Sequence, residues 1–375
     1  MLRYMTAGES HGKALMAILD GVPAGLKMDK GVVDKELARR MVGYGRGGRM
    51  AIEKDKVEIV AGCRKGMTIG SPIGMVVANK DFKIDKLPAV RSPRPGHADL
   101  AGLLKYGFRD VRDVLERASA RETAARVAVG AVAKLILGEF GIKLLSHVTM
   151  IGGIEAKTEK LSFGEILKAA EKSDVRCADR EAAKFMREEI DRVKKEGNTL
   201  GGSFEVIAIG VPPGLGSYAQ WDKRLDGALA RSVMSIPAVK AVSMGGGIES
   251  ASKKGSEAHD PITYHKAAKA FARPSNIAGG LEGGVTNGSP VVVRGFMKPI
   301  ATLGAPLTSV DINTKKKISA AKERADVCAV AACGVVAESA VAFELASSLL
   351  EKLGGDSMTE LRGNYSAYMR HLKEM

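Results

Sequence analysis

Residues 115–135, LERASARETAARVAVGAVAKL, contain a helix start that can be placed by its chemistry. Ser119 precedes Glu122 by the spacing of a capping box, and an alanine-rich apolar run follows, so a helix is predicted to begin here. Arg117 and Arg121 flank this start, where the helix dipole favours acidic side chains. Because free N–H groups and two cations together favour an anion, the stretch indicates a phosphate or carboxylate site. The alternative is a surface turn whose arginines pair with neighbouring glutamates.

Patterns elsewhere predict further helices and strands. Helical periodicity is clearest over residues 119–138, 180–196 and 334–353. Strand patterns lie near residues 57–61, 143–154 and 203–214, and Asn287-Gly288 predicts a hairpin turn before a further strand. Strands next to strands, with long helices between the groups, indicate an α+β class in which antiparallel sheets pack on a helical layer.

The sequence also contains a faint internal repeat. GVPAGL at residues 21–26 recurs as GVPPGL at 210–215, and TIGSPIGMVV at 68–77 recurs as TNGSPVVVRG at 286–295. Two pairs in the same order predict one domain, residues 1–375, with pseudo-repeated halves of roughly 1–140 and 200–350. Chance similarity of glycine and proline turns is the alternative. No linker rich in proline, serine or charge divides the chain.

The charge of the chain limits its possible partners. A formal net charge of +14 requires an anionic partner, which can be nucleic acid, a membrane surface or a small phosphorylated molecule. Aromatic residues make up only 5% of the chain, and no basic tail is present, which argues against nucleic acid. No long apolar run or signal-peptide core is visible, so we expect a cytoplasmic protein without a membrane partner. The four cysteines form no CxxC pair, so reduced thiols and no metal site are expected.

Residues 8–12 read GESHG, which matches the G-x-S-x-G nucleophile elbow of serine hydrolases. An elbow follows a central strand of a long sheet, and only seven residues precede this motif. The motif therefore indicates instead a histidine, His11, held between glycines beside Ser10. Such a histidine can act as a general acid or base, and the open question is what it would protonate.

Three other stretches have side chains suited to a binding site. SPRPGHADL at 92–100 places His97 on a loop stiffened by two prolines, although a solvated histidine is the simpler interpretation. GGLEGGVTNGSP at 279–290 permits close backbone approach to a ligand or is a structural hairpin. Arg324 and Asp326 precede the last predicted long helix, where they form either a functional pair or an ion pair.

Together these stretches resemble the chorismate synthase family. The resemblance covers nearly the whole chain and rests on the motifs TAGESHG, RRMVGYGRGGRM, SPRPGHADL, RASARETAARVAVGA, GSYAQWDKRLD, SIPAVK, GGLEGGVTNG, MKPIAT and ADVCAV. It implies a 1,4-anti elimination of phosphate from 5-enolpyruvylshikimate 3-phosphate to give chorismate, the last step of the shikimate pathway, with reduced FMN as the cofactor. It also implies a β-α-β sandwich of two antiparallel sheets around helices, and a homotetramer. The match of GESHG to the nucleophile elbow then arises by chance.

The resemblance assigns roles residue by residue. It implies that His11 protonates the departing phosphate, that His97 serves the N1 side of the reduced flavin, and that Asp326 assists at the flavin N5 as a base. Ser10 and Ser119 would help by hydrogen bonding. The implied flavin contacts are Arg117, Ala118, Ser119, Pro237, Ala238, Gly283, Lys298, Pro299, Ile300, Ala301, Thr302 and Arg324. The arginines expected to neutralise the substrate or NADPH are Arg40, Arg46, Arg49, Arg94 and Arg121.

Two alternatives and three departures accompany this interpretation. One alternative is an NADPH-dependent flavin reductase, alone or in addition, and Arg40 and Arg46 match positions that the family assigns to NADPH. The other is a nucleic-acid-binding protein recruited by the positive charge. Ala325, Ala331 and Ser289 replace residues that are more common in the family. They put in question the rigidity around Asp326 and the shape of the flavin site.

Overall fold

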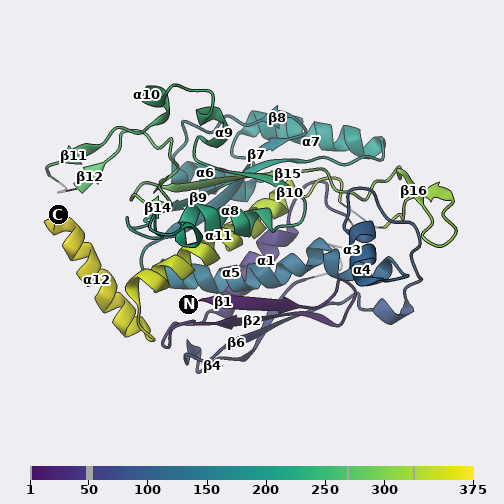
Figure 1. The fold of residues 1–375 in the computed structure, drawn as a ribbon, viewed down its shortest axis with the longest axis horizontal. Coiled ribbons are helices and arrows are strands. Elements are labelled where there is room, and N and C mark those ends of the chain that lie inside the picture. The colour runs from purple at the N-terminus through teal and green to yellow at the C-terminus, as the bar shows by residue number, and fades with distance from the viewer. Residues whose placement is uncertain (1, 48–53, 268–269, 324–325) are drawn as a thin grey trace.

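The computed structural model describes residues 2–47, 54–267, 270–323 and 326–375. Two antiparallel sheets lie on opposite sides of a layer of long helices (Figure 1). The α+β class with antiparallel sheets, expected from the sequence, is thereby confirmed.

Both large sheets have a simple strand order. The first is β1-β2-β6-β3, formed by β1 (Arg3–Ala7), β2 (Ala14–Asp20), β6 (Ile73–Ala78) and β3 (Val57–Ala61). The second is β10-β15-β9-β7-β8, formed by β10 (Val239–Met244), β15 (Val291–Met297), β9 (Gly202–Ile209), β7 (Lys143–Ile151) and β8 (Ile154–Glu155). All neighbouring strands in these two sheets pair antiparallel. Side chains of β2 alternate between the core and the exposed outer face, as the period of a strand requires.

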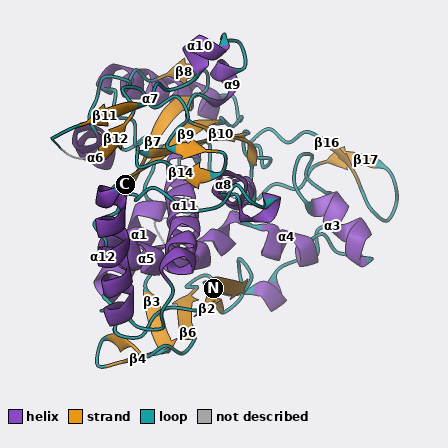
Figure 2. Ribbon diagram, turned by 60° about the vertical axis from the view of Figure 1, so that its left-hand side comes forward, coloured by secondary structure: helices purple, strands orange, loops and turns teal. Residues whose placement is uncertain are grey.

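Three helices separate the two sheets (Figure 2): α1 (Lys30–Met41), α5 (Thr123–Gly138) and α11 (Val330–Leu353). Helix α5 packs on β2 and β6, whereas α11 packs on β7 and β9. The two helices meet where a Cβ added to Gly130 would lie 2.3 Å from the Cβ of Ser339, so only glycine fits there. Helix α11 is long and apolar enough to span a membrane, but 78% of its apolar window is buried inside the protein, as in a core helix.

The remaining elements surround this core. The helices are α3 (Asp99–Tyr106), α4 (Arg112–Ala118), α6 (Phe163–Lys172), α7 (Arg180–Lys195), α8 (Leu225–Met234), α9 (Gly247–Ser250), α10 (Gly255–Ala258) and α12 (Met358–Glu374). The 3-10 turns are η1 (Ile84–Lys86), η2 (Ala120–Glu122) and η3 (Trp221–Lys223). The small hairpins are β4 (Cys63–Arg64) with β5 (Met67–Thr68), β11 (Thr263–His265) with β12 (Ala270–Ala272), β13 (Leu281–Glu282) with β14 (Val285–Thr286), and β16 (Thr308–Val310) with β17 (Lys317–Ser319).

Two expectations about local structure are wrong. Ser119 does not begin a long helix through a capping box: it caps η2 by accepting from the Arg121 N–H at 3.3 Å, and α5 begins at Thr123. The Glu122 carboxylate accepts from Arg126 and not, as a capping box would require, from the backbone N–H of Ser119. Asn287-Gly288 does not join a hairpin either, because β15 pairs with β9 and β10 and not with β14.

The expected helices and strands otherwise fall close to their observed positions. The helix expected over residues 180–196 is α7, and the one expected from 334 begins at Val330, one turn earlier. The strand patterns near 57–61, 143–154 and 203–214 correspond to β3, β7 and β9. Strong apolar periodicity therefore located elements well, whereas local turn chemistry did not decide which strands pair.

The repeated sequence stretches make matching hydrogen bonds. Thr68 Oγ1 accepts from the Leu26 N–H at 2.9 Å and donates to the Pro23 carbonyl at 2.6 Å. Thr286 Oγ1 makes the corresponding two bonds at 2.8 and 2.7 Å in the second stretch. In each case the threonine lies in a short strand, β5 or β14, and binds the turn that follows an inner strand, β2 or β9. The next strand along the chain, β6 or β15, pairs with that inner strand.

Candidate active site

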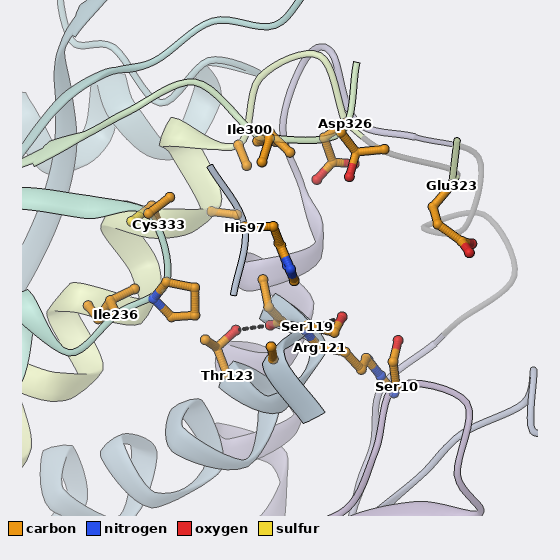
Figure 3. Close-up of a pocket in the computed structure, with 18 of the residues that line it drawn as sticks. Ser10, His97, Ser119, Arg121, Thr123, Ile236, Ile300, Glu323, Asp326 and Cys333 are labelled. Atoms are coloured by element: carbon orange, nitrogen blue, oxygen red, sulfur yellow. Dashed lines mark hydrogen bonds between the residues drawn. The ribbon is translucent and has the colours of Figure 1, made fainter. Parts of the chain in front are cut away.

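A cavity of about 420 Å³ lies where the N-terminal ends of α5 and α11 meet the C-terminal end of α1. Figure 3 shows side chains from distant parts of the chain around it, among them Ser10, His97, Ser119, Arg121 and Asp326. Among the described residues, the first half of the chain supplies both histidines and all four arginines that line the cavity. The second half supplies residues 236–238, 297–302 and the start of α11. The volume of the cavity lies within the range of ordinary small-molecule sites.

Most residues predicted from the sequence line this cavity. They include the five residues assigned to catalysis: Ser10, His11, His97, Ser119 and Asp326. They also include Arg40, Arg46, Arg94, Ala118, Arg121, Pro237, Ala238, Lys298, Ile300, Ala301 and Thr302. The lining does not include Arg117, Gly283 or Pro299. Arg49, Arg324 and Ala325 lie outside the described residues.

Two of the expected flavin contacts have other positions. Arg117 donates to the carbonyls of Gly8 and Thr6, at 2.9 and 3.1 Å, and so holds the chain that leads to His11. Gly283 lies in the turn between β13 and β14, with a positive φ of 59°. Its conformation accounts for the glycine at this turn.

His11 is bound on one edge by a buried glutamate of α4. Its Nδ1 lies 3.0 Å from both carboxylate oxygens of Glu116, whose side chain is 2% exposed. The backbone N–H of His11 donates to the same carboxylate at 2.8 Å. On the other edge, Nε2 lies 4.0 Å from Asp81 Oδ2. The ring therefore has a fixed orientation at the wall of the cavity.

His97 also has a carboxylate partner. Its Nδ1 lies 2.5 Å from Asp99 Oδ1, and Arg94 binds the same carboxylate through Nε at 2.8 Å and Nη2 at 3.0 Å. Burial would raise the pKa of Asp99, but hydrogen bonds from His97 and Arg94 hold that pKa well below its usual range. Arg94 also donates to Thr302, at 2.8 Å. Because these bonds occupy its guanidinium, Arg94 supports the His97 loop more directly than it offers donors to a ligand.

Two arginines share one buried carboxylate at one wall of the cavity. Arg121 Nη1 donates to Asp55 Oδ2 at 2.7 Å, and Arg40 Nη1 lies 3.7 Å from the same oxygen. Burial, with Arg46 nearby, lowers the pKa of Arg40 to about 10, so Arg40 stays charged at neutral pH. Among the described residues, Arg40 Nη1 is buried without a hydrogen-bond acceptor. Two cations facing one anion leave this wall positive, which suits an anionic ligand.

The Arg121 guanidinium connects this positive wall to the loop that carries His11. Arg121 Nε donates to Asn79 Oδ1 at 2.9 Å. The Asn79 amide then donates to the carbonyls of Gly12 and Glu9, at 2.8 and 3.1 Å. The anion site and the GESHG loop are therefore held in fixed relative positions by one asparagine.

Asp326 closes the opposite side of the cavity. Its Oδ1 accepts from the Gly47 N–H at 2.6 Å, and its Oδ2 lies 3.3 Å from Arg46 Nε. These contacts join the chain before α11 to the glycine-rich loop after α1. The carboxylate lines the cavity on the same side as Ile300 (Figure 3).

Apolar side chains complete the lining. Leu115, Ile236, Met297, Ile300, Cys333 and Val336 provide carbon and sulfur surface between the polar groups. A planar aromatic ring system with an anionic tail fits this combination, because the rings need apolar contact and the tail needs cations. The residues present therefore fit FMN, and Arg40 Nη1 is a buried donor available for an anionic group.

A positive wall, two carboxylate-bound histidines and an apolar floor in one cavity define an enzyme site for an anionic small molecule. The chorismate synthase family model matches residues 2–350. Chorismate synthase from Desulforudis audaxviator (strain MP104C) is 53% identical over 385 residues, covering 100% of this chain and 98% of the relative. Chorismate synthase from Geobacillus kaustophilus (strain HTA426) is 52% identical over 388 residues and is covered completely.

A solved structure described as a crystal structure of chorismate synthase has a TM-score of 0.84 at 44% identity, covering 100% of this chain and 99% of the other. The chain belongs to the chorismate synthase family. It is a carbon-oxygen lyase that forms chorismate and phosphate from 5-enolpyruvylshikimate 3-phosphate in the shikimate pathway. The family uses reduced FMN.

Sequence reasoning missed the residues that hold the site together. Asp99 carried a weak signal, because it stands two positions after His97 on a stiff loop. Asp55 and Asn79 belong to no motif, and Glu116 is 105 residues from His11. Among the departures from the family pattern, Ala331 is buried in α11, and the backbone N–H of Ser289 donates to Asn287 Oδ1 at 2.9 Å.

Proposed function

We propose that this cavity binds 5-enolpyruvylshikimate 3-phosphate together with reduced FMN, and that His11, His97 and Asp326 carry out its proton transfers. The observation that carries the proposal is that these three side chains, with Ser10 and Ser119, line one cavity although they are spread from position 10 to 326. Reduced FMN, when bound, would supply the electron density that assists loss of phosphate.

Arginines would bind the anionic groups of the substrate and flavin. Arg40 and Arg121 have the best support, because both are buried at the cavity and both lie beside the Asp55 carboxylate. Arg46 forms an ion pair with Asp326, so its charge would stabilise that carboxylate as well as an anionic ligand. A low-polarity site strengthens each of these interactions and excludes water.

The elimination breaks one C–O bond and one C–H bond, so it needs an acid and a base. We assign the acid to His11, which would deliver a proton to the departing phosphate. His97 would hold a proton toward the N1 side of the flavin, and Asp326 would accept a proton. Ser10 and Ser119 would orient the ligands by hydrogen bonding. Lys298, Ile300, Ala301, Thr302, Pro237 and Ala238 would contact the flavin.

We also propose that the chain is one domain of two duplicated halves, that it works in the cytoplasm and that it assembles as a homotetramer. The matching strand orders β1-β2-β6-β3 and β7-β9-β15-β10 support the duplication.

The exposed outer face of the first sheet, with Met5, Met16, Ile18 and Val60, offers apolar surface for assembly. Light scattering on a sizing column tests the assembly: the mass of a single chain at all concentrations would contradict it.

Anaerobic turnover tests the assignment of the site. Substrate with chemically reduced FMN should give chorismate and phosphate in equal amounts, and oxidised FMN should give neither. A parallel reaction with oxidised FMN and NADPH as sole reductant tests whether the protein also reduces its flavin. Product formation in that reaction, lost in Arg40→Ala or Arg46→Ala while chemically reduced FMN still supports turnover, would assign these arginines to NADPH.

The role of His11 is tested separately. His11→Ala should lower kcat by about 10²- to 10⁴-fold because the leaving group loses its acid, while folding and flavin binding stay near normal. Circular dichroism and flavin titration provide the controls. Turnover at the wild-type rate would remove His11 from the mechanism.

A further inference from the structure

We propose that Glu116 is a positioning residue, whose carboxylate holds the imidazole of His11 in one orientation and one tautomer. The inference rests on the proposed role of His11 and adds a residue that the resemblance did not assign. Glu116 is not among the residues that line the cavity, so it would act through His11 and not on the ligand.

Three hydrogen bonds connect residue 116 to the GESHG loop. The Glu116 carboxylate accepts from the His11 backbone N–H at 2.8 Å and meets His11 Nδ1 at 3.0 Å. The backbone carbonyl of Glu116 accepts from the Ser10 N–H at 2.9 Å. One residue therefore fixes both the backbone and the ring of the proposed acid, which leaves the ring little freedom to turn.

Helix α4 places this carboxylate where water cannot replace it. The Glu116 side chain is 2% exposed, and Arg112, one turn earlier on the same helix, lies 3.5 Å from it. Arg112 also binds Glu323, at 3.0 Å, and Glu323 lines the cavity. Because this carboxylate is buried, replacement of Glu116 would remove an ionised acceptor from the His11 Nδ1 edge.

The charge of Glu116 determines the tautomer. Burial raises the pKa of this carboxyl, but hydrogen bonds from the ring and backbone of His11 outweigh burial and lower it. An ionised carboxylate only accepts, so Nδ1 must be the donor in this contact. The proton that His11 delivers to a ligand then comes from Nε2, and this delivery requires the imidazolium form, which carries a proton on both ring nitrogens. In the described part of the chain, the charged groups near that edge include Asp81, at 4.0 Å, and Lys83, which binds Asp81 at 2.9 Å.

The first test compares three variants of the whole enzyme. Glu116→Gln keeps the shape of the side chain but adds an amide donor, so kcat should fall about 10- to 100-fold while KM changes less than about threefold. Glu116→Asp keeps the carboxylate and should recover part of the loss. Glu205→Gln is the matched control, because Glu205, whose side chain is 13% exposed, also contacts a histidine, His147 at 3.3 Å, outside the cavity. It should leave kcat within about twofold.

The second test observes the ring directly, without turnover. Protein labelled with ¹⁵N-histidine gives separate signals for the two ring nitrogens, and His11→Ala assigns those of His11. At a pH where the ring is neutral, wild type and Glu116→Asp should show a protonated Nδ1. Glu116→Gln should shift the proton toward Nε2 or give averaged signals, because an amide can donate to Nδ1.

The outcomes separate this inference from the role of His11. Unchanged kcat and an unchanged Nδ1 proton in Glu116→Gln would overturn the positioning role. A lower kcat with an unaltered ring spectrum would also overturn it, since the loss would then come from elsewhere. Normal turnover in His11→Ala would instead refute the proposed acid, while the spectra would still decide whether Glu116 sets the tautomer.

Discussion

Asp99 Oδ1 lies 2.5 Å from His97 Nδ1, while the same carboxylate is bound by Arg94 from the same short loop. The backbone N–H of Arg94 also donates to Asp99, at 3.0 Å. The carboxylate is completely buried, so these contacts replace its hydration. A histidine at the cavity is thus supported by an ion pair that stabilises the fold.

Replacement of this carboxylate should destabilise the enzyme. Asp99→Asn leaves the buried charge of Arg94 without its counter-ion, so the free energy of unfolding should fall by about 3 kcal/mol. Urea denaturation measures the change. The exposed pair of Arg187 and Asp174, 36% and 48% exposed, gives the control. Asp174→Asn should cost less than about 1 kcal/mol, and equal losses in both variants would contradict the prediction.

The contribution of Asp99 should depend on pH in a defined direction. Its pKa is lowered in the folded protein, so its stabilisation is fully present above the unfolded value of about 3.9 and is lost as pH falls toward the folded pKa. The stability difference between wild type and Asp99→Asn should therefore shrink as the pH falls below about 4. Urea titrations across this range test it, and a difference that grows with acid would have the wrong sign.

Asp55 should control how strongly the cavity responds to anions. Asp55→Asn removes the shared carboxylate between Arg40 and Arg121, so the protein should lose about 3 kcal/mol without ligand. Inorganic phosphate should then restore more stability to the variant than it adds to wild type, because it replaces the missing negative charge. Thermal unfolding at increasing phosphate, with chloride at matched ionic strength as the control, measures this. Equal shifts in both proteins would refute the prediction.

The contact between α5 and α11 should not tolerate a methyl group. In Gly130→Ala the new Cβ would meet Ser339 at 2.3 Å, so unfolding free energy should fall by about 1–3 kcal/mol. Gly138→Ala is the control on the same helix, since no atom lies within 4 Å of its added Cβ. That change should be neutral or stabilising by up to about 1 kcal/mol. Chemical denaturation distinguishes the two, and similar values would contradict the tight crossing.

The two repeated threonines should contribute equally. Thr68→Val and Thr286→Val each remove a hydroxyl that makes two buried hydrogen bonds. Each should cost about 1–3 kcal/mol, chiefly because a backbone N–H and a carbonyl lose their partner. Denaturation curves would show midpoints displaced by similar amounts. A large loss in one variant and none in the other would mean that the two stretches are not structurally equivalent.

Sequence patterns predicted elements and motif residues better than the contacts between them. Apolar periodicity located α7 and β9 because a buried face imposes a repeat on the sequence. The hairpin expected at Asn287-Gly288 was wrong because pairing with β9 and β10 decides where β15 lies. The contact between Glu116 and His11 joins residues that are 105 positions apart in the sequence, and no local pattern predicts such a pair.

The cavity takes its reactive groups from both halves of the chain, so a cut between the halves would separate these groups. Residues up to the end of α5 bring His11, His97 and Arg121, whereas Lys298 and Asp326 come from beyond β9. Two polypeptides made separately, divided between α7 and β9, would each contain an incomplete set of reactive groups. Their turnover would rise with concentration as they associate, so the lyase reaction would itself report complementation between the fragments.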